Sequence, residues 1–567
     1  MAMNKQFPQV NALDWATVKP SFDALLTIEL NAQTVDGWLQ QWSDLEAVLE
    51  EAGAQIYREI TENTVDAAAE ERFNLYVEEI LPRVKIAVQA LKQKLLAVES
   101  YQPAAEIALL LRRFRTEAGI FRDENVPLQS RLTLLGNQYN KIVGGMTIAW
   151  QGQTETLPMA KSHLEEPDRG AREAVWQRMM DCFLVQRQTL NELYLEMVPL
   201  RRQVARNAGF ATYRDYRWQE LARFDYSPED CVTYHDAIER EVVPLATQIY
   251  ENRVRKLGID RMRPWDTDAD PFGEPLRPFQ NVAELEEGCY RVFQQVDPAL
   301  AGQFAILRDG YLDLASRPNK APGGYSNGFP VIGKPYIFMN AVGTHDNVTT
   351  LLHEGGHAFH FIESQRQSLL WNQNGPMEFC EVASMSMELL SAPYLGQRYG
   401  GFYDEAGVRR ALVQELEGIV LFLPYMAVVD AFQHWVYSEA AEDITAGDLD
   451  ATWSQLWDRF MPGVDYGGLQ PEKETGWHRK GHIFESPFYY IEYGLAQLGA
   501  LQVWRNSLQH GNAKAVADYR SALALGYTRS LPELFQAAGA RFAFDRQTVG
   551  ELMALIQEQL VDLRGLP

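Results

Sequence analysis

The sequence is poor in cysteine and lacks an apolar N-terminal segment. Its 567 residues contain 4 cysteines, Cys182, Cys231, Cys289 and Cys380, and no C-x-x-C pair that would indicate a zinc ribbon or a redox motif. We therefore expect free thiols, buried as cysteine usually is, in a reducing compartment. The N-terminal residues lack the apolar core of an export signal, and together these features predict a cytoplasmic protein.

Long apolar runs and clusters of positive charge are also missing. The longest apolar run, residues 418–429, is too short to cross a bilayer and contains Pro424, so we interpret it as part of a buried helix and expect no membrane segment. Acidic residues outnumber basic ones by 76 to 52, for a net charge of −24, and no run of Lys and Arg is available to bind nucleic acid. A hydrophobic fraction of 46% is typical of a folded globular protein and excludes a mainly disordered chain. The sequence predicts no particular oligomeric state.

Apolar residues recur at three- and four-residue steps through the first half of the chain, which predicts packed amphipathic helices. A longer helical stretch is predicted from about residue 172 towards residue 207, with Gly209 as its stop signal. The Pro-, Asp- and Gly-rich stretch 264–278 predicts a loop. Short strands are predicted at 311–314 and 335–340, separated by a Gly- and Pro-rich stretch, and helices return from about residue 347. The expected fold is mainly α with a small β-sheet.

The clearest chemical motif is H-E-x-x-H, formed by His353, Glu354 and His357. Residues four apart lie on one face of a helix, so the two imidazoles can bind one ion while Glu354 reaches towards a metal-bound water. Zinc suits two neutral imidazoles and a carboxylate, because a fourth position then stays open for water or substrate. A chance match is the competing explanation, and the apolar helical setting of the motif argues against it.

A third ligand is expected from the segment that follows. Glu378, Glu381 and Glu388 lie at spacings of three and seven, which places their carboxylates on one face of a helix. The apolar residues between them predict a mostly buried helix, where unpaired carboxylates would be costly. The alternative is a solvated acidic stripe, and spacing alone does not choose among the three glutamates.

Four segments match the motifs of a known family. They are His353-Glu-Gly-Gly-His-Ala-Phe-His360, Glu378-Phe-Cys-Glu-Val-Ala-Ser384, Pro322-Gly-Gly-Tyr325 with Phe338-Met-Asn340, and Gly481-His-Ile-Phe-Glu-Ser-Pro-Phe-Tyr-Tyr-Ile-Glu-Tyr-Gly494. On these residues the sequence resembles the oligoendopeptidase F and thimet oligopeptidase family of zinc metallopeptidases, and oligoendopeptidase F most closely. The resemblance implies two helical lobes that enclose a substrate channel, with the small sheet next to the zinc helix. We expect an N-terminal helical lobe at 1–190 and a catalytic lobe at 191–567, with its sheet at about 306–342, metal helices at about 347–390 and a His and Tyr segment at 481–494.

The resemblance also implies roles for individual residues. His353 and His357 match the histidine ligands of one zinc ion, Glu381 matches the third ligand, and Glu354 matches the catalytic carboxylate. His482, Tyr490 and Tyr493 match the residues that contact the substrate carbonyl, and Tyr489 is a rival for Tyr490. Without the zinc motif, an aromatic core would be the simpler explanation of that segment.

The expected function is a zinc oligoendopeptidase that cleaves internal bonds of short unstructured peptides. One alternative is a peptidase that trims from one end, like a carboxydipeptidase. Another is a zinc-stabilised peptide-binding protein without turnover, which Glu354 argues against because it is not expected to bind the metal. An extended substrate is expected to pair with a free strand edge at 336–340.

Several other residues have simpler explanations. His360 is either close behind the site or a buried core imidazole, and histidines such as His235 and His434 show no ligand-like spacing. Gly355 and Gly356 weaken a helix by roughly 1 kcal/mol each, which suggests that substrate or another helix approaches closely there.

Overall fold

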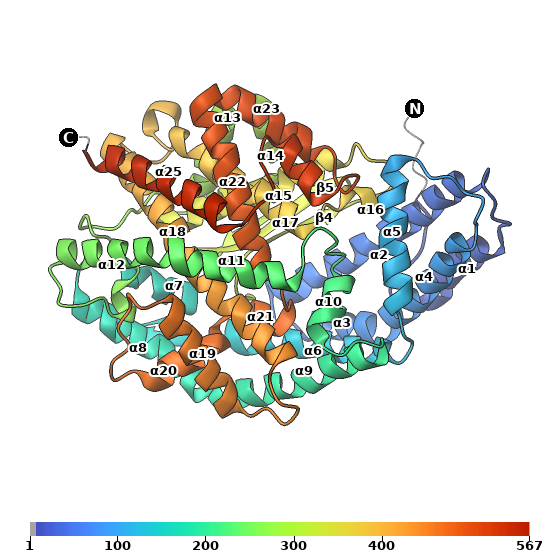
Figure 1. The fold of residues 1–567 in the computed structure, drawn as a ribbon, viewed down its shortest axis with the longest axis horizontal. Helices are drawn as coiled ribbons and strands as arrows, with labels where there is room; N and C mark the ends of the chain where they lie inside the picture. The colour runs from blue at the N-terminus through green and yellow to red at the C-terminus, as the bar shows by residue number, and fades with distance from the viewer. Residues whose placement is uncertain (1–6, 566–567) are drawn as a thin grey trace.

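The computed structural model describes residues 7–565, and most of them are helical, which confirms the mainly α fold class (Figure 1). The helices before the sheet are α1 (Trp15–Thr27), α2 (Val35–Glu62), α3 (Ala67–Leu75), α4 (Leu81–Leu96), α5 (Ala105–Ile120), α6 (Asn125–Gly144), α7 (Leu157–Ser162), α8 (Arg169–Val185), α9 (Arg187–Asn207), α10 (Tyr213–Glu220), α11 (Pro228–Glu241), α12 (Val243–Leu257), α13 (Val282–Val296) and α14 (Pro298–Leu307). The helices after it are α15 (His345–Ser364), α16 (Leu370–Gln373), α17 (Met377–Ser391), α18 (Glu405–Ser438), α19 (Ala446–Phe460), α20 (Gln470–Glu474), α21 (Gly481–Glu485), α22 (Tyr490–His510), α23 (Asn512–Leu523), α24 (Leu531–Ala537) and α25 (Arg546–Gly565).

The N-terminal helices α1, α2, α4 and α5 gather at one end of the molecule, drawn in blue at the right of Figure 1. They share a hydrophobic core of their own, centred on Trp38, Trp42 and Phe114, which Trp371 of α16 completes. Helices α6 and α9 instead contribute to the large core that extends to α25. The division of the chain near residue 190 stays a prediction.

The helical stretch predicted from about residue 172 to residue 207 is confirmed, with Gly209 at a positive φ after its end, but it is divided into two helices that meet at Gln186. Trp176 and Met180 of α8 pack in a small core with Trp265, whereas Leu190 and Leu193 of α9 belong to the large core. The break therefore follows from packing against two different neighbours, and no glycine or proline marks it in the sequence. The loop predicted over 264–278 is confirmed apart from the short 3₁₀ turn Pro264–Asp266.

The small sheet contains β3 (Leu312–Ala315), β4 (Tyr325–Phe329) and β5 (Lys334–Ala341) in the order β3-β5-β4. Both predicted strands are present, but β4 was expected as an irregular Gly- and Pro-rich stretch. Strand β5 is parallel to β3 and antiparallel to β4, so the expectation of a free edge at 336–340 is wrong. The edge strand on that side is β4, because no further strand among residues 7–565 pairs with it. A separate hairpin of β1 (Thr147–Trp150) and β2 (Gln153–Thr156) was not anticipated.

The apolar run around Pro424 lies inside α18, as expected of a buried helix. Among the described residues, α18 is the one helix long and apolar enough to cross a membrane, but 61% of its most apolar window is buried within the protein. A core helix of a folded protein has this character, and we interpret α18 in that way.

Candidate metal centre

Three packed helices carry the residues of the candidate site. Helix α15 follows β5 directly and starts with a capping box between Thr344 and Asn347, which fixes the direction in which the helix leaves the sheet. Helix α17 packs against α15 on one side and against α22 on the other. The H-E-x-x-H motif therefore faces the acidic helix, and the tyrosine segment lies close to both.

Two glycines allow α15 to approach its neighbours closely, as the sequence suggested. A Cβ atom at Gly356 would lie 2.5 Å from Ser384 Cα and 2.6 Å from Ala383 O, both backbone atoms of α17. A Cβ atom at Gly355 would lie 2.6 Å from the ring of Phe293. The helix-weakening Gly-Gly pair is thus explained by close helix packing on both sides of α15.

The structure brings His353, His357 and Glu381 together. Glu381 Oε2 lies 3.3 Å from His353 Nε2 and 3.4 Å from His357 Nε2, and one ligand atom from each residue falls within 4.8 Å of the others. Despite burial, which would raise it, the pKa of Glu381 is held well below its usual range by His357 and His353. A carboxylate with two imidazole nitrogens is a donor set that fits zinc.

Glu354 is buried beside this group, and no residue within 7–565 forms an ion pair with it. Its Oε2 has no hydrogen-bond partner among the described residues. Its Oε1 lies 3.2 Å from where a Cβ atom of Gly324 would stand, just before β4. Burial raises the pKa of Glu354, which His357 and His353 partly oppose. An unpartnered carboxylate oxygen here fits a water molecule next to a bound ion.

The structure shows which of the three glutamates lies near the histidines, a choice that their spacing in the sequence did not make. Glu388 lies behind the motif, where its Oε1 is 2.6 Å from His353 Nδ1. Glu378 points elsewhere and accepts a hydrogen bond of 2.6 Å from the hydroxyl of Tyr226, beside Arg223. Only Glu381 therefore faces both histidines.

A further carboxyl group, Glu415 of α18, was not found from the sequence. It shares a hydrogen bond with Glu388, and burial together with Glu388 raises its pKa well above the usual range. A protonated Glu415 can donate to Glu388, which in turn holds the ring of His353. No sequence signal indicated it, because Glu415 belongs to a different helix.

The His and Tyr segment lies against the same site. His482 Nε2 is 3.1 Å from the hydroxyl of Tyr493, and the hydroxyl of Tyr489 donates a hydrogen bond of 2.6 Å to Glu381 Oε1. Tyr489 and Tyr493 are half-buried one helical turn apart, whereas Tyr490 is buried and its hydroxyl accepts a hydrogen bond from Lys480. Burial lowers the pKa of His482 to about 3, so its imidazole is neutral. The geometry favours Tyr489 over Tyr490 as the neighbour of the metal centre.

A model of the sequence family described as Peptidase family M3 matches residues 162–553. The chain belongs to peptidase family M3. The match includes every residue of the candidate metal centre and of the His and Tyr segment, and it confirms the resemblance that their motifs indicated. This M3 member is therefore a peptidase.

Individual relatives agree with the family. The M3 peptidase is 22% identical over 507 residues to a protein of Mycoplasma pneumoniae named "Oligoendopeptidase F homolog", covering 81% of this chain and 76% of that protein. A solved structure named "putative Oligoendopeptidase F" superposes with a TM-score of 0.92 at 26% identity, covering 98% of this chain and 99% of the other. A structure named "PZ PEPTIDASE A with inhibitor 2" also gives a TM-score of 0.92, at 25% identity over 98% of both chains.

His360, three positions after His357, is a buried imidazole of this M3 peptidase. Its ring lies 2.7 Å from where a Cβ atom of Gly375 would stand and packs against Phe379. Burial lowers its pKa to about 3. His360 therefore contributes to the packing of α15 against α17.

Proposed function

We propose that this chain is a zinc-dependent oligoendopeptidase that hydrolyses internal bonds of short unstructured peptides. The observation that carries the proposal is the meeting of His353, His357 and Glu381 beside an unpartnered oxygen of Glu354. His353, His357 and Glu381 would hold the ion. When bound, zinc would supply a Lewis acid that polarises the peptide carbonyl and lowers the pKa of a water molecule to about 7.

Glu354 is the general base in this proposal. It takes a proton from the attacking water and passes the proton to the amine that leaves when the C–N bond breaks. Its burial supports the role, because a carboxylate whose pKa is raised accepts a proton readily and gives it up again.

His482 and Tyr493 would stabilise the negative charge that develops on the carbonyl oxygen. Because the imidazole of His482 is neutral, its Nε2–H can donate to the Tyr493 oxygen, which leaves the phenol proton free for the substrate. A single donor of this kind contributes roughly 3 kcal/mol to transition-state stabilisation. Tyr489 donates its hydroxyl proton to Glu381 and so would hold that proposed ligand in place, and the role expected for Tyr490 has less geometric support.

Strand β4 is the proposed place of the substrate backbone. It is an edge strand that begins directly after Gly324, which lies beside Glu354, and an extended peptide added there would be held by main-chain hydrogen bonds that tolerate many side chains. A cavity of about 620 Å³ borders the His and Tyr segment. N-terminal residues such as Tyr57 and Asn137 line it together with Glu485 and Ser486 of that segment.

Product analysis tests the proposal. A peptide of about ten residues is expected to give internal fragments by mass spectrometry, while a folded protein stays intact. Stepwise release of dipeptides from one end would instead support the trimming alternative.

The variant Glu354→Gln tests whether Glu354 is needed for hydrolysis but not for zinc binding. The variant is expected to keep its zinc but to lose at least about 100-fold in kcat, because general base catalysis contributes roughly 10²–10⁴. A variant that binds zinc and still cleaves at the wild-type rate would refute the role of Glu354.

A further inference from the structure

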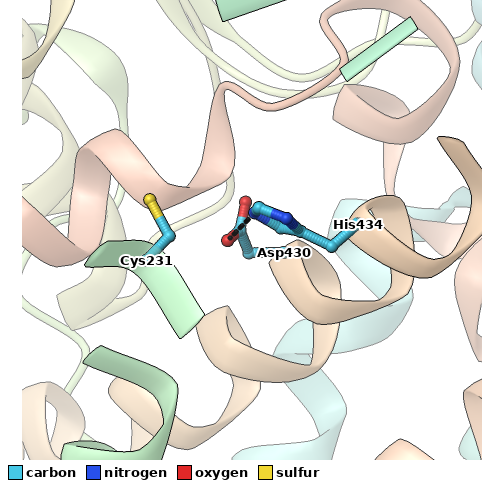
Figure 2. Close-up of side chains that lie close together, drawn as sticks. All are labelled: Cys231, Asp430 and His434. Atoms are coloured by element: carbon cyan, nitrogen blue, oxygen red, sulfur yellow. Dashed lines mark ion pairs between the residues drawn. The ribbon is translucent and has the colours of Figure 1, made fainter. Parts of the chain in front are cut away.

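A second cluster of metal-ligating side chains lies between α11 and α18, away from the H-E-x-x-H motif. Cys231 and His235 are one turn apart on α11, and Asp430 and His434 are one turn apart on α18. Figure 2 shows Cys231 on one helix, and Asp430 and His434 side by side on the other. One ligand atom each from Cys231, Asp430 and His434 lies within 4.8 Å of the others.

These side chains are buried and their hydrogen bonding is incomplete. Asp430 is 0% exposed and His434 is 4% exposed. Asp430 Oδ1 and both ring nitrogens of His434 have no hydrogen-bond partner among the described residues. His434 Nε2 lies 3.2 Å from Asp430 Oδ2, as an ion pair when the imidazole is charged. Buried polar atoms without partners are costly, so the cluster lacks a component.

The charge of the cluster indicates which component fits. Within residues 7–565, the ion-pair partners of Asp430 are His235 and His434 alone, so no lysine or arginine neutralises this carboxylate. A divalent cation bound by one carboxylate, one thiolate and one neutral imidazole forms a neutral group, which is the state most easily buried. Sulfur, nitrogen and oxygen donors together suit zinc.

We propose that Cys231, Asp430 and His434 supply three ligands of a second zinc site that joins α11 to α18. Asp430 binds through its unpartnered Oδ1, while His235 Nε2, 2.9 Å from Asp430 Oδ2, holds the carboxylate in orientation. Binding forms a sulfur–metal bond and releases the thiol proton of Cys231 to solvent. The inference does not depend on the proposed catalytic role of the first site.

The position of the cluster suggests what the metal would stabilise. The ring of His434 packs against Phe488, with centroids 5.3 Å apart. Phe488 has a positive φ of 64°, and its N–H donates to Gln433, the neighbour of His434. Tyr489 follows directly, so the cluster supports the strained turn that leads into the tyrosines of α22.

Cobalt substitution of the full chain tests the proposal. A thiolate ligand gives Co²⁺ an intense near-ultraviolet charge-transfer band, which the proposed catalytic donors, two imidazoles and a carboxylate, cannot produce. We expect the band in the wild type and in His353→Ala/His357→Ala, and its loss in Cys231→Ser. Cys289→Ser is the matched control, because Cys289 is equally buried in α13 without ligand-like neighbours, and it should keep the band.

Metal counting gives a second measurement that does not require the Cys231 variant to fold. We expect two zinc ions per wild-type chain and one in His353→Ala/His357→Ala, and removal of that remaining ion should lower Tm by several degrees. Absence of the cobalt band, together with no zinc in the double variant, would overturn the proposal and leave a proton on an imidazole as the partner of Asp430. A band that persists in Cys231→Ser would also overturn it.

Discussion

At the scale of single residues, the carboxylates around His353 differ in distance and partner rather than in chemistry. Glu381 faces both imidazoles, Glu388 lies behind one of them, and Glu378 belongs to a separate buried ion pair. These positions predict different consequences for the same substitution.

Glu381→Ala is expected to weaken zinc binding by well over 100-fold, because it removes a proposed ligand. Glu388→Ala should weaken zinc binding by about 10–100-fold, because it removes no ligand but removes the hydrogen bond that orients the ring of His353. Glu378→Ala should leave zinc affinity nearly unchanged and lower Tm, because the buried Arg223 loses a partner. Competition with a chelator measures all three affinities, and an equal loss in each variant would contradict the assignment of Glu381.

Tyr493→Phe is expected to lower kcat by about 10²–10³ with little change in KM, the pattern of a contact made only in the transition state. Tyr490→Phe is the matched control, because its hydroxyl is buried against Lys480, and it should change kcat far less. A larger effect at Tyr490 would restore it as the substrate-facing residue. Steady-state kinetics on one peptide decides between them.

At the scale of helices, the site depends on how closely α15 and α17 approach each other. Any side chain at position 356 would meet the backbone of α17 and push the two helices apart. The distance from the two histidines to Glu381 therefore depends on Gly356, a residue without a side chain that takes no part in metal binding.

Gly356→Ala should destabilise the protein by about 1–3 kcal/mol, as overpacking does, and also weaken zinc binding. Gly418→Ala in α18 is the matched control, because nothing lies within 4 Å of its added Cβ atom and alanine favours the helix by about 0.5–1 kcal/mol. Thermal unfolding and metal titration measure both effects. Equal stability of the two variants would refute the close-packing argument.

At the scale of the whole molecule, buried carboxyl groups make stability depend on pH. Glu492 is 1% exposed, and burial raises its pKa to about 8, although Arg223 partly opposes the shift. The folded state therefore holds this proton more tightly than the unfolded chain does. The stabilisation is complete below the unfolded pKa of about 4.3 and is lost as pH rises towards 8.

Glu492 should thus lower the free energy of unfolding as pH rises from 6 to 8, by up to about 1.4 kcal/mol per pH unit. Glu492→Gln removes the titrating group while keeping the shape of the side chain, so its stability should change less over the same range. Urea unfolding at several pH values measures both slopes. Parallel slopes would show that Glu492 does not titrate in this interval.

The sequence by itself determined the features that depend on short distances along the chain. Four-residue spacing places His353 and His357 on one face of a helix wherever that helix lies, and short apolar segments on either side of a Gly- and Pro-rich stretch indicate strands β3 and β5. Motif resemblance added Glu381 and the His and Tyr segment, and it indicated the family correctly.

Only the tertiary structure decided which groups meet across long separations. It brought Glu381 to both histidines, placed β5 inside the sheet, and divided α8 from α9 where no local signal marks a break. It also brought Cys231 to Asp430 and His434, a grouping that the spacing of these residues along the chain did not predict. The physical reason is that helix geometry is local, whereas the packing of one helix against another depends on side chains hundreds of residues apart.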